Sequence, residues 1–206
     1  MAQRPYAMEF YKDPQRFEGT CPVCNMLYVK ELAEDRRIHR AFHRSVVDVF
    51  EPKPSVTLAK LYSCHGQLVP VRWDSPQPLR RRLASLSRVF KREFGCDFTM
   101  YSETGDPGDG YLVAEPDGRA VGGFVVRWIE YSNAPAQWML SWVWIAPTHR
   151  RRGLMRAAWL MAKDKYPGID PDPPFSKGAA EFFANRDDLS ERIRKYAQGQ
   201  LAADSF

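Results

Sequence analysis

Four potential metal ligands lie close together near the start of the chain. Cys21 and Cys24 are separated by two residues, and after fourteen intervening residues His39 and His43 follow at the i, i+4 spacing of one helix face. Two such thiolates hold Zn²⁺ from one turn, and two such imidazoles complete a tetrahedron. The spacing predicts a structural C2H2 zinc finger over residues 19–47. Because these ligands fill the coordination sphere, no position remains for a catalytic water.

The rest of the finger indicates a docking or orienting element rather than a reader of DNA bases. Its helix is expected to begin among acidic residues, which repel phosphates, although arginines on later turns allow weak nucleic-acid contact. Small disulfide scaffolds are much denser in cysteine, so 4 Cys in 206 residues favour metal over disulfides. The residues expected to form the small core of the finger are Met26, Tyr28, Leu32, Ile38 and Phe42.

A second chemical pattern follows an apolar run later in the chain. The sequence WMLSWVWIAP predicts a buried strand, and helical composition begins soon after it. The loop between them contains Arg150, Arg151, Arg152 and Gly153. Exposed backbone N–H groups, the positive end of a helix and arginine charge together predict an anion-binding site, for which a pyrophosphate is the natural occupant.

Composition excludes several classes of protein. Hydrophobic residues make up 44% and charged residues 27%, so the chain can form a packed core. A net charge of +5 favours a polyanionic cofactor or partner without indicating a dedicated nucleic-acid-binding protein. The sequence has no apolar run of membrane-spanning length and no apolar stretch typical of a signal peptide. We therefore expect no membrane partner and a cytoplasmic location, or a nuclear one in a eukaryote.

The order of the expected elements predicts an α/β (α+β) fold with a mixed central sheet flanked by helices. Residues 1–18 are expected to be an irregular lead-in, and the proline-bearing stretch 51–55 separates the finger from a second domain at 56–206. In and just before that domain, periodicity and turn signals predict strands at 55–63 and 67–73, a helix at 78–95, a hairpin at 111–131, a strand at 137–147 and helices at 148–168, 177–188 and 189–200.

The pattern Arg150-x-x-Gly153-x-Met155 after an apolar strand resembles the acetyl-CoA loop of the GCN5-related N-acetyltransferases (GNAT), although Met155 stands where that family has Gly or Ala. With CPVCNMLY…D…HRAFH ahead of it, the chain resembles the Eco/ESCO sister-chromatid cohesion acetyltransferases, whose finger has Gly in place of Asn25. The segments KREFGCDF, DGRAVGGFVV and SWVWIAPTHRRRGLMRAA are similar to further family segments in the same order. The resemblance covers residues 20–185.

The resemblance implies an acetyl-CoA-dependent N-acetyltransferase with a structural zinc ion. It also implies which residues contact the cofactor: strand backbone along the acetyl-pantetheine arm, the basic loop around the pyrophosphate, and a third segment further on. These residues are Val143, Trp144 and Ile145, then Arg150, Arg151, Arg152, Gly153, Leu154, Met155 and Arg156, and finally Ser176, Lys177 and Gly178.

The catalytic residues of the family match this sequence only in part. Ser141 stands at the family's serine, Leu160 occupies the position of its glutamate, and the expected aspartate is displaced. A lysine ammonium must lose a proton before it attacks a thioester, so a carboxylate is needed as general base. We expect Asp172 to be that base and Ser141 to orient the amine or relay a proton. Alternative bases are Asp170, Glu181 and Glu130, and an alternative role for Asp172 is to cap its proline-rich turn.

The leading hypothesis is acetylation of a lysine in a protein, so the expected partner is a protein with an accessible lysine. The same fold also serves acyl transfer to a small amine or a modified nucleobase. A third hypothesis is a catalytically inactive zinc-finger binding module, which the replaced glutamate and the displaced aspartate favour.

Overall fold

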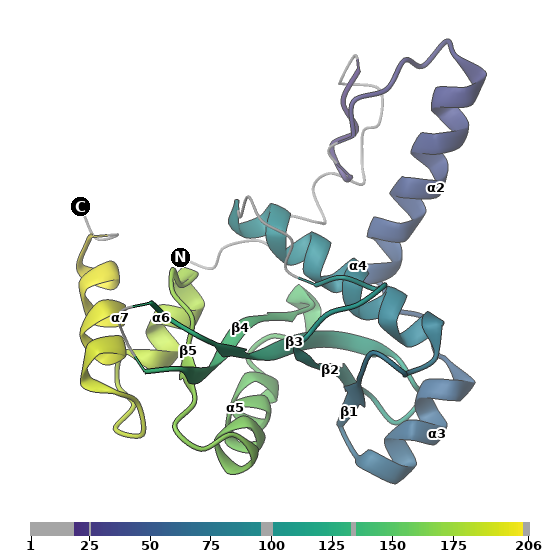
Figure 1. Ribbon diagram of the computed structural model, residues 1–206. Helices are drawn as coiled ribbons and strands as arrows, with labels where there is room; N and C mark the ends of the chain where they lie inside the picture. Colours follow the sequence, from purple (N-terminus) through teal and green to yellow (C-terminus); the bar gives the residue numbers. More distant parts are fainter. Residues whose placement is uncertain (1–18, 25, 96–100, 133–134, 204–206) are drawn as a thin grey trace.

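The structure is a computed structural model, and it describes residues 19–24, 26–95, 101–132 and 135–203. These residues form a body built on a sheet, from which one long helix, α2 (Ala33–Phe50), leads to the zinc-finger segment (Figure 1). The lead-in expected at residues 1–18 lies outside the described residues. None of the described helices is long and apolar enough to cross a membrane.

The central sheet is mixed, as the order of the elements predicts. Its described strands lie in the spatial order β1 to β5, with β1 to β4 antiparallel to one another in turn and β5 parallel to β4. The strands are β1 (Leu68–Val71), β2 (Asp109–Ala114), β3 (Ala120–Ile129), β4 (Gln137–Ile145) and β5 (Asp170–Pro171). The predicted α/β class is therefore confirmed.

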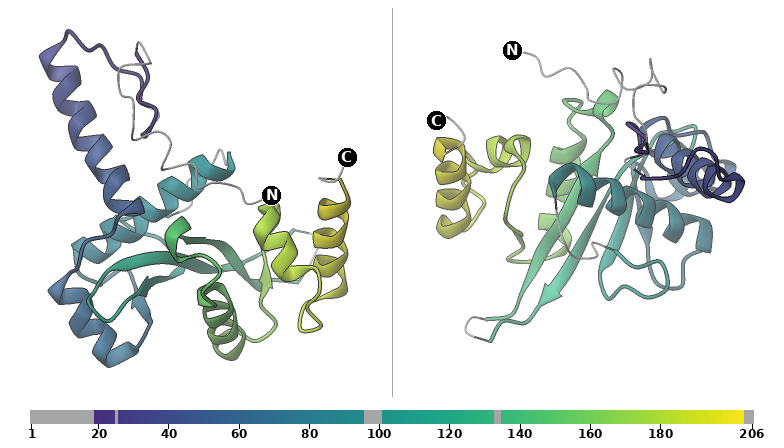
Figure 2. Two further views of the ribbon diagram at one scale, coloured as in Figure 1. Left: turned by 180° about the vertical axis from the view of Figure 1, so that it is seen from behind. Right: turned by 90° about the horizontal axis from the view of Figure 1, so that it is seen from above.

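Helices cover both faces of this sheet (Figure 2). Alternate side chains of β4 pack against the helices on opposite faces of the sheet, because successive side chains of a strand point to opposite faces. Trp142 and Trp144 belong to one apolar cluster, and Val143 and Ile145 belong to the other. The layer on the side of Trp142 and Trp144 contains α2, α3 (Val56–His65) and α4 (Gln77–Phe94). The layer on the other side contains α5 (Leu154–Lys165), α6 (Lys177–Phe183) and α7 (Glu191–Ala203). A short 3-10 turn, η1 (Pro147–His149), leads from β4 toward α5.

Helix α4 forms where the apolar spacing predicts a helix. Its inner face is buried at Leu79, Leu83, Leu86 and Val89. Gly95 follows the last turn with φ +66°, a left-handed conformation that glycine adopts without a steric penalty. The predicted glycine stop of this helix is therefore confirmed.

The prediction of a strand at residues 55–63 is wrong, because this segment forms helix α3. Ser55 caps the helix: its Oγ accepts a hydrogen bond from the N–H of Leu58 at 3.3 Å. Leu58 is buried, and Leu61 and Tyr62 pack against the same cluster. These apolar residues are spaced at i, i+3 and i+4, so the helical pattern outweighs the β-branched residues nearby.

The β2–β3 hairpin turns at Asp117 and Gly118, as predicted. Gly118 has φ +81°, and a Cβ atom at this position would lie 2.0 Å from the carbonyl oxygen of Ser55. Only glycine fits here, and the turn packs tightly against the start of α3. The hairpin and the first helix of the domain are thereby held together.

Candidate functional site

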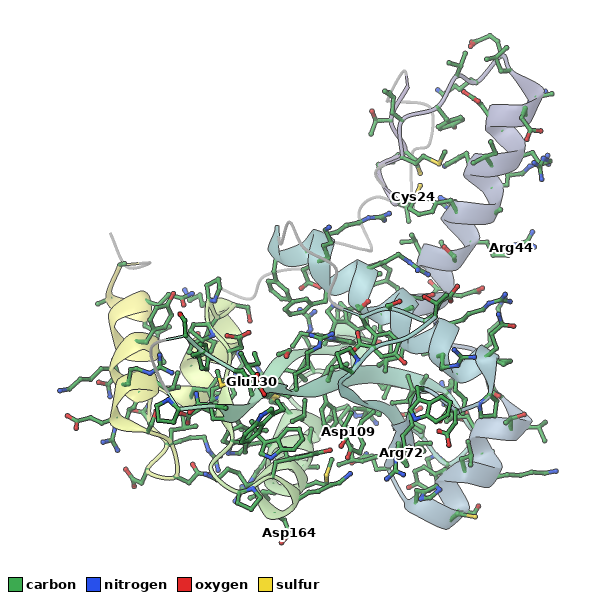
Figure 3. The ribbon with its side chains drawn as sticks, viewed as in Figure 1. Cys24, Arg44, Arg72, Asp109, Glu130 and Asp164 are labelled. Atoms are coloured by element: carbon green, nitrogen blue, oxygen red, sulfur yellow. The ribbon has the colours of Figure 1, made fainter. Side chains whose placement is uncertain are left out.

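The four predicted zinc ligands converge at the base of the finger. The N–H of Cys21 donates to the carbonyl oxygen of Met26 at 2.9 Å, which closes the turn that holds both cysteines. His39 and His43 belong to α2, the helix beside which Cys24 lies in Figure 3. The ligand atoms of the four side chains all lie within 4.8 Å of one another, and Cys21 Sγ is 3.3 Å from His43 Nδ1.

Two features of this cluster fit a metal ion. His39 Nε2 is buried and has no hydrogen-bond partner among the described residues. Burial raises the pKa of the Cys24 thiol to about 11, so its thiolate form needs a neighbouring cation. A set of two sulfur and two imidazole ligands in a volume of this size suits Zn²⁺. Residues Cys21, Cys24, His39 and His43 therefore fit a structural zinc ion.

The core of the finger is smaller than the sequence predicts. Met26, Tyr28 and Phe42 pack against the buried cysteines and Val46, as the sequence predicts. The prediction is wrong for Leu32 and Ile38, which are 55% and 43% exposed. The finger has too few residues to cover both sides of α2, so only the side that faces the cysteine turn is buried.

A β-bulge interrupts the pairing of β4 with β3. Val125 pairs with Trp142, whereas Val126 pairs with Leu140, so Ser141 is left without a partner in β3. The Oγ atom of Ser141 is buried and has no hydrogen-bond partner in the described part of the chain. A buried hydroxyl without a partner is energetically unfavourable, and such groups are rare in folded proteins.

Asp172 reaches β4 beside this bulge. The last paired residues of β4 and β5 are Leu140 and Pro171, and the N–H of Asp172 then donates to the carbonyl oxygen of Leu140 at 3.0 Å. Beyond this bond the described pairing of the two strands stops, so β5 does not pair with the following residues of β4. The fold therefore brings Ser141 and Asp172, which are far apart in sequence, to one place.

The basic loop leads into the N-terminus of α5. Arg151 has φ +64° and Gly153 has φ +80°, so two residues of the loop are left-handed. A Cβ atom on Gly153 would meet nothing within 4 Å, which leaves open space in front of the helix. The first N–H groups of α5 have no partner within the helix, and together with the loop they offer donors and positive charge to an anion. Leu154 is buried in the core, while Arg156 is exposed.

The three arginines of the loop have different partners. The Arg150 side chain donates from Nε to the Ile145 carbonyl oxygen at 2.9 Å and from Nη2 to Glu93 at 2.8 Å. Arg151 lies 3.4 Å from Glu181, and Arg152 lies 3.4 Å from Glu115, with both arginine side chains more than half exposed. Arg150 therefore shapes the loop, whereas Arg151 and Arg152 are available to an incoming anion.

Two family models match this chain. Residues 12–45 match the zinc finger of acetyl-transferase ESCO, and residues 73–169 match the acetyltransferase (GNAT) family. The chain carries an ESCO-type zinc finger and a GNAT acetyltransferase domain. It is an acetyl-CoA-dependent N-acetyltransferase with a structural zinc site.

Solved structures with a similar fold include acetyltransferases. The xEco2 acetyltransferase domain is 14% identical with a TM-score of 0.42, over 56% of this chain and 81% of that chain. The same domain bound to a K105-CoA conjugate is 12% identical with a TM-score of 0.42, over 66% and 87%. The aminoglycoside acetyltransferase HMB0005 from an uncultured soil metagenomic sample is 16% identical with a TM-score of 0.40, over 59% and 92%. No curated protein sequence matches the chain.

In the GNAT domain, the environment of Asp172 suits a proton acceptor. Its side chain is half-buried, and burial raises the pKa of the carboxyl group, while Arg127 and Arg192 act in the opposite direction. A carboxylate with a raised pKa binds a proton more readily than an exposed one.

The alternative bases either have other partners or lie away from the bulge between β3 and β4 of the GNAT domain. Asp170 is buried and accepts a hydrogen bond from the N–H of Ser190 at 3.3 Å. Glu181 is exposed and lies beside Arg151. Glu130 is exposed just after β3 ends, and Leu160 is half exposed on α5. Among these candidates, Asp172 is the carboxylate that the backbone pairing places beside Ser141.

The third predicted cofactor segment begins α6 of the GNAT domain. The Oγ of Ser176 accepts a hydrogen bond from the N–H of Ala179 at 3.2 Å, so Ser176 caps the helix. Lys177 and Gly178 are exposed in its first turn. The ion pair of Arg151 with Glu181 joins this helix to the basic loop, which brings the two predicted cofactor segments close together.

Sequence reasoning missed Glu93, which organises the predicted cofactor loop from α4. Its carboxylate accepts hydrogen bonds from Trp144 Nε1 at 2.7 Å and from Arg150 Nη2 at 2.8 Å. Trp144 therefore points its side chain toward α4, and its backbone position pairs with Gly123 of β3. The signal available in the sequence was an acidic residue at the end of an amphipathic helix, which by itself is common.

Proposed function

We propose that this chain transfers an acetyl group from acetyl-CoA to the side-chain amine of a lysine in a protein. The observation that supports this most directly is the meeting of Ser141 and Asp172 where β4 and β5 stop pairing. The match of residues 12–45 to an ESCO-type finger favours a protein as the acceptor over a free small amine.

The cofactor would be held by the layer of the GNAT domain that contains α5. Arg151, Arg152 and the N–H groups at the start of α5 would bind its pyrophosphate, with Gly153 leaving room for the approach. The backbone of Val143 and the N–H group of Ile145, on the side of β4 where pairing with β5 has stopped, would line the acetyl-pantetheine arm. When bound, acetyl-CoA supplies an activated thioester.

The residues of the chain would then handle protons and orientation. A lysine ammonium has an ordinary pKa of about 10.4, so Asp172 would accept a proton on its carboxylate oxygen, directly or through one water. Ser141 Oγ, which is buried and has no partner among the described residues, would orient the amine that Asp172 has deprotonated. Backbone N–H groups of β4 beyond the bulge would stabilise negative charge on the carbonyl oxygen.

The test is a transfer assay with isotopically labelled acetyl-CoA and two sets of acceptors. One set is a pool of lysine-bearing proteins analysed by peptide mass spectrometry, and the other is a panel of small amines. Labelled acetyl-lysine that is absent with Asp172→Asn supports the proposal. Label that appears only on small amines assigns the acceptor to that class, and cofactor binding without any transfer assigns the chain to the inactive binding modules.

A further inference from the structure

Arg92, near the end of α4, holds the zinc finger against the body of the protein. Its Nη1 donates a hydrogen bond to the carbonyl oxygen of Cys24 at 2.9 Å. The guanidinium group also lies over the ring of Phe42, 4.5 Å from the ring centroid. Cys24 belongs to the cysteine turn and Phe42 to α2, so one side chain contacts both halves of the finger.

Glu93, the next residue, holds the other end of this connection. It accepts hydrogen bonds from Trp144 Nε1 and from Arg150 Nη2, and Arg150 Nε donates to the carbonyl oxygen of Ile145. Trp144 is only 1% exposed, so its indole N–H has no access to solvent as an alternative partner. Glu93 therefore fixes both the end of β4 and the start of the basic loop.

The two residues form a continuous set of contacts between the zinc ligands and the basic loop. They are adjacent on the last turn of α4, which ends at Phe94 and is followed by the capping residue Gly95. The last turn of a helix frays more easily than its middle, so its position depends on the side-chain contacts that it makes. The cysteine turn supplies the contact with Arg92, and zinc holds that turn in place because the finger has a small core.

We propose that Arg92 and Glu93 are positioning residues that couple zinc binding in the finger to acetyl-CoA binding at the loop of residues 150–156. The proposal rests on the cofactor site described under the proposed function. Coupling between two sites is reciprocal: if zinc strengthens CoA binding by some factor, CoA strengthens zinc binding by the same factor. The coupling runs through contacts that single substitutions in α4 remove.

The experiment measures the dissociation constant for CoA by calorimetry, on the full chain with zinc and after its removal by a chelator. The same samples give the rate of zinc transfer to a chromogenic chelator with and without CoA. The variant is Arg92→Ala, and its matched control is Arg88→Ala. Arg88 is an exposed arginine one turn earlier on α4, and its Nη2 donates to Ser85 Oγ at 3.0 Å. Glu93→Gln, which keeps an acceptor for Trp144 but loses the charge that pairs with Arg150, breaks the connection at its other end.

We expect removal of zinc to weaken CoA binding on the order of tenfold in the wild type and in Arg88→Ala. Arg92→Ala should retain its zinc and bind CoA weakly whether or not zinc is present, and Glu93→Gln should behave likewise. An unchanged affinity for CoA after zinc removal from the wild type would overturn the coupling. So would full zinc dependence in Arg92→Ala, because general destabilisation would then explain the effect. A wild type that binds zinc but no CoA would overturn the cofactor site and the coupling together.

Discussion

The N–H of Asp172 and the carbonyl oxygen of Leu140 lie 3.0 Å apart, and this hydrogen bond is the last that joins the two strands. It extends the β4–β5 pairing by one residue and carries Asp172 to the level of Ser141. The same point of β4 holds the bulge, so the backbone of Ser141 is unpaired on the side of β3. Under the proposed function, a substrate amine that enters where the strands separate would approach both residues.

Replacing Asp172 by asparagine should lower kcat on a lysine substrate by about 10²–10⁴ at neutral pH, because a general base is lost. Affinity for CoA should stay unchanged. Raising the pH should partly restore the variant, since more of the substrate amine is then already neutral. The measurement is kcat and KM across pH, and wild-type rates in Asp172→Asn would exclude this residue as the base.

The raised pKa of Asp172 also predicts the acid side of the wild-type pH profile. Burial raises the folded-state pKa of this carboxyl group above its ordinary value, so the group becomes protonated, and activity is lost, at a higher pH than for an exposed aspartate. Asp172→Asn should lack that step. An acid limb that is identical in both proteins would assign it to another group.

Ser141→Ala should separate activity from stability. Its buried Oγ has no hydrogen-bond partner in the part of the chain that the structure describes, so removing it should leave the melting temperature unchanged or raise it, while kcat falls. The matched control is Ser87→Ala, because Ser87 is also buried but donates to the carbonyl oxygen of Ala84 at 2.9 Å. That variant should lose about 1 kcal/mol of stability without a change in kcat. A lower melting temperature for Ser141→Ala together with an unaltered kcat would show that Ser141 is structural.

Gly153→Glu should abolish CoA binding, since a carboxylate would then occupy the open space at the start of α5 with the same charge as the pyrophosphate. Gly168→Glu is the matched control: both glycines have a positive φ and no atom within 4 Å of an added Cβ. Each variant should lose about 1 kcal/mol or more of stability from the backbone conformation alone. Calorimetry should therefore distinguish them, and equal CoA affinity in the two variants would place the cofactor elsewhere.

Metal analysis of the purified chain should find about one zinc ion per molecule, and Cys24→Ala or His43→Ala should remove it. Loss of zinc should unfold the finger locally while the GNAT domain stays folded, because its two apolar clusters contain none of the ligands. Limited proteolysis would then cut within residues 19–45 first. Full zinc content in both variants would contradict the assigned ligands.

The parts of the molecule that sequence predicts well are those set by local spacing. The zinc ligands are fixed by intervals of three and four residues, and α4 by apolar residues on one face. The strand predicted at 55–63 failed because its β-branched residues are few, whereas the cap at Ser55 and the packing of Leu58 favour a helix. Local propensity predicts secondary structure poorly in segments whose conformation is determined by tertiary packing.

The site was predictable only as far as local patterns and family resemblance extend. Ser141 and Asp172 were named from a resemblance, and the pairing of β4 with β5 gives the physical reason that they meet. Arg150 and Glu93 lie 57 positions apart in the sequence, so no local pattern could predict their hydrogen bond. Leu32 and Ile38 look like core residues in sequence, but the fold supplies nothing to cover them.

Helix α2 has no glycine or proline between Ala33 and Phe50, so it has no hinge between the zinc ligands and the sheet. An unbroken helix of 18 residues is about 27 Å long and resists bending. A partner bound to the finger is therefore held at a fixed distance and angle from the point where β4 and β5 separate. Under the proposed function, this rigid helix would select a substrate lysine by its distance from the docking point on the substrate protein. The residues next to that lysine in the substrate sequence would matter less.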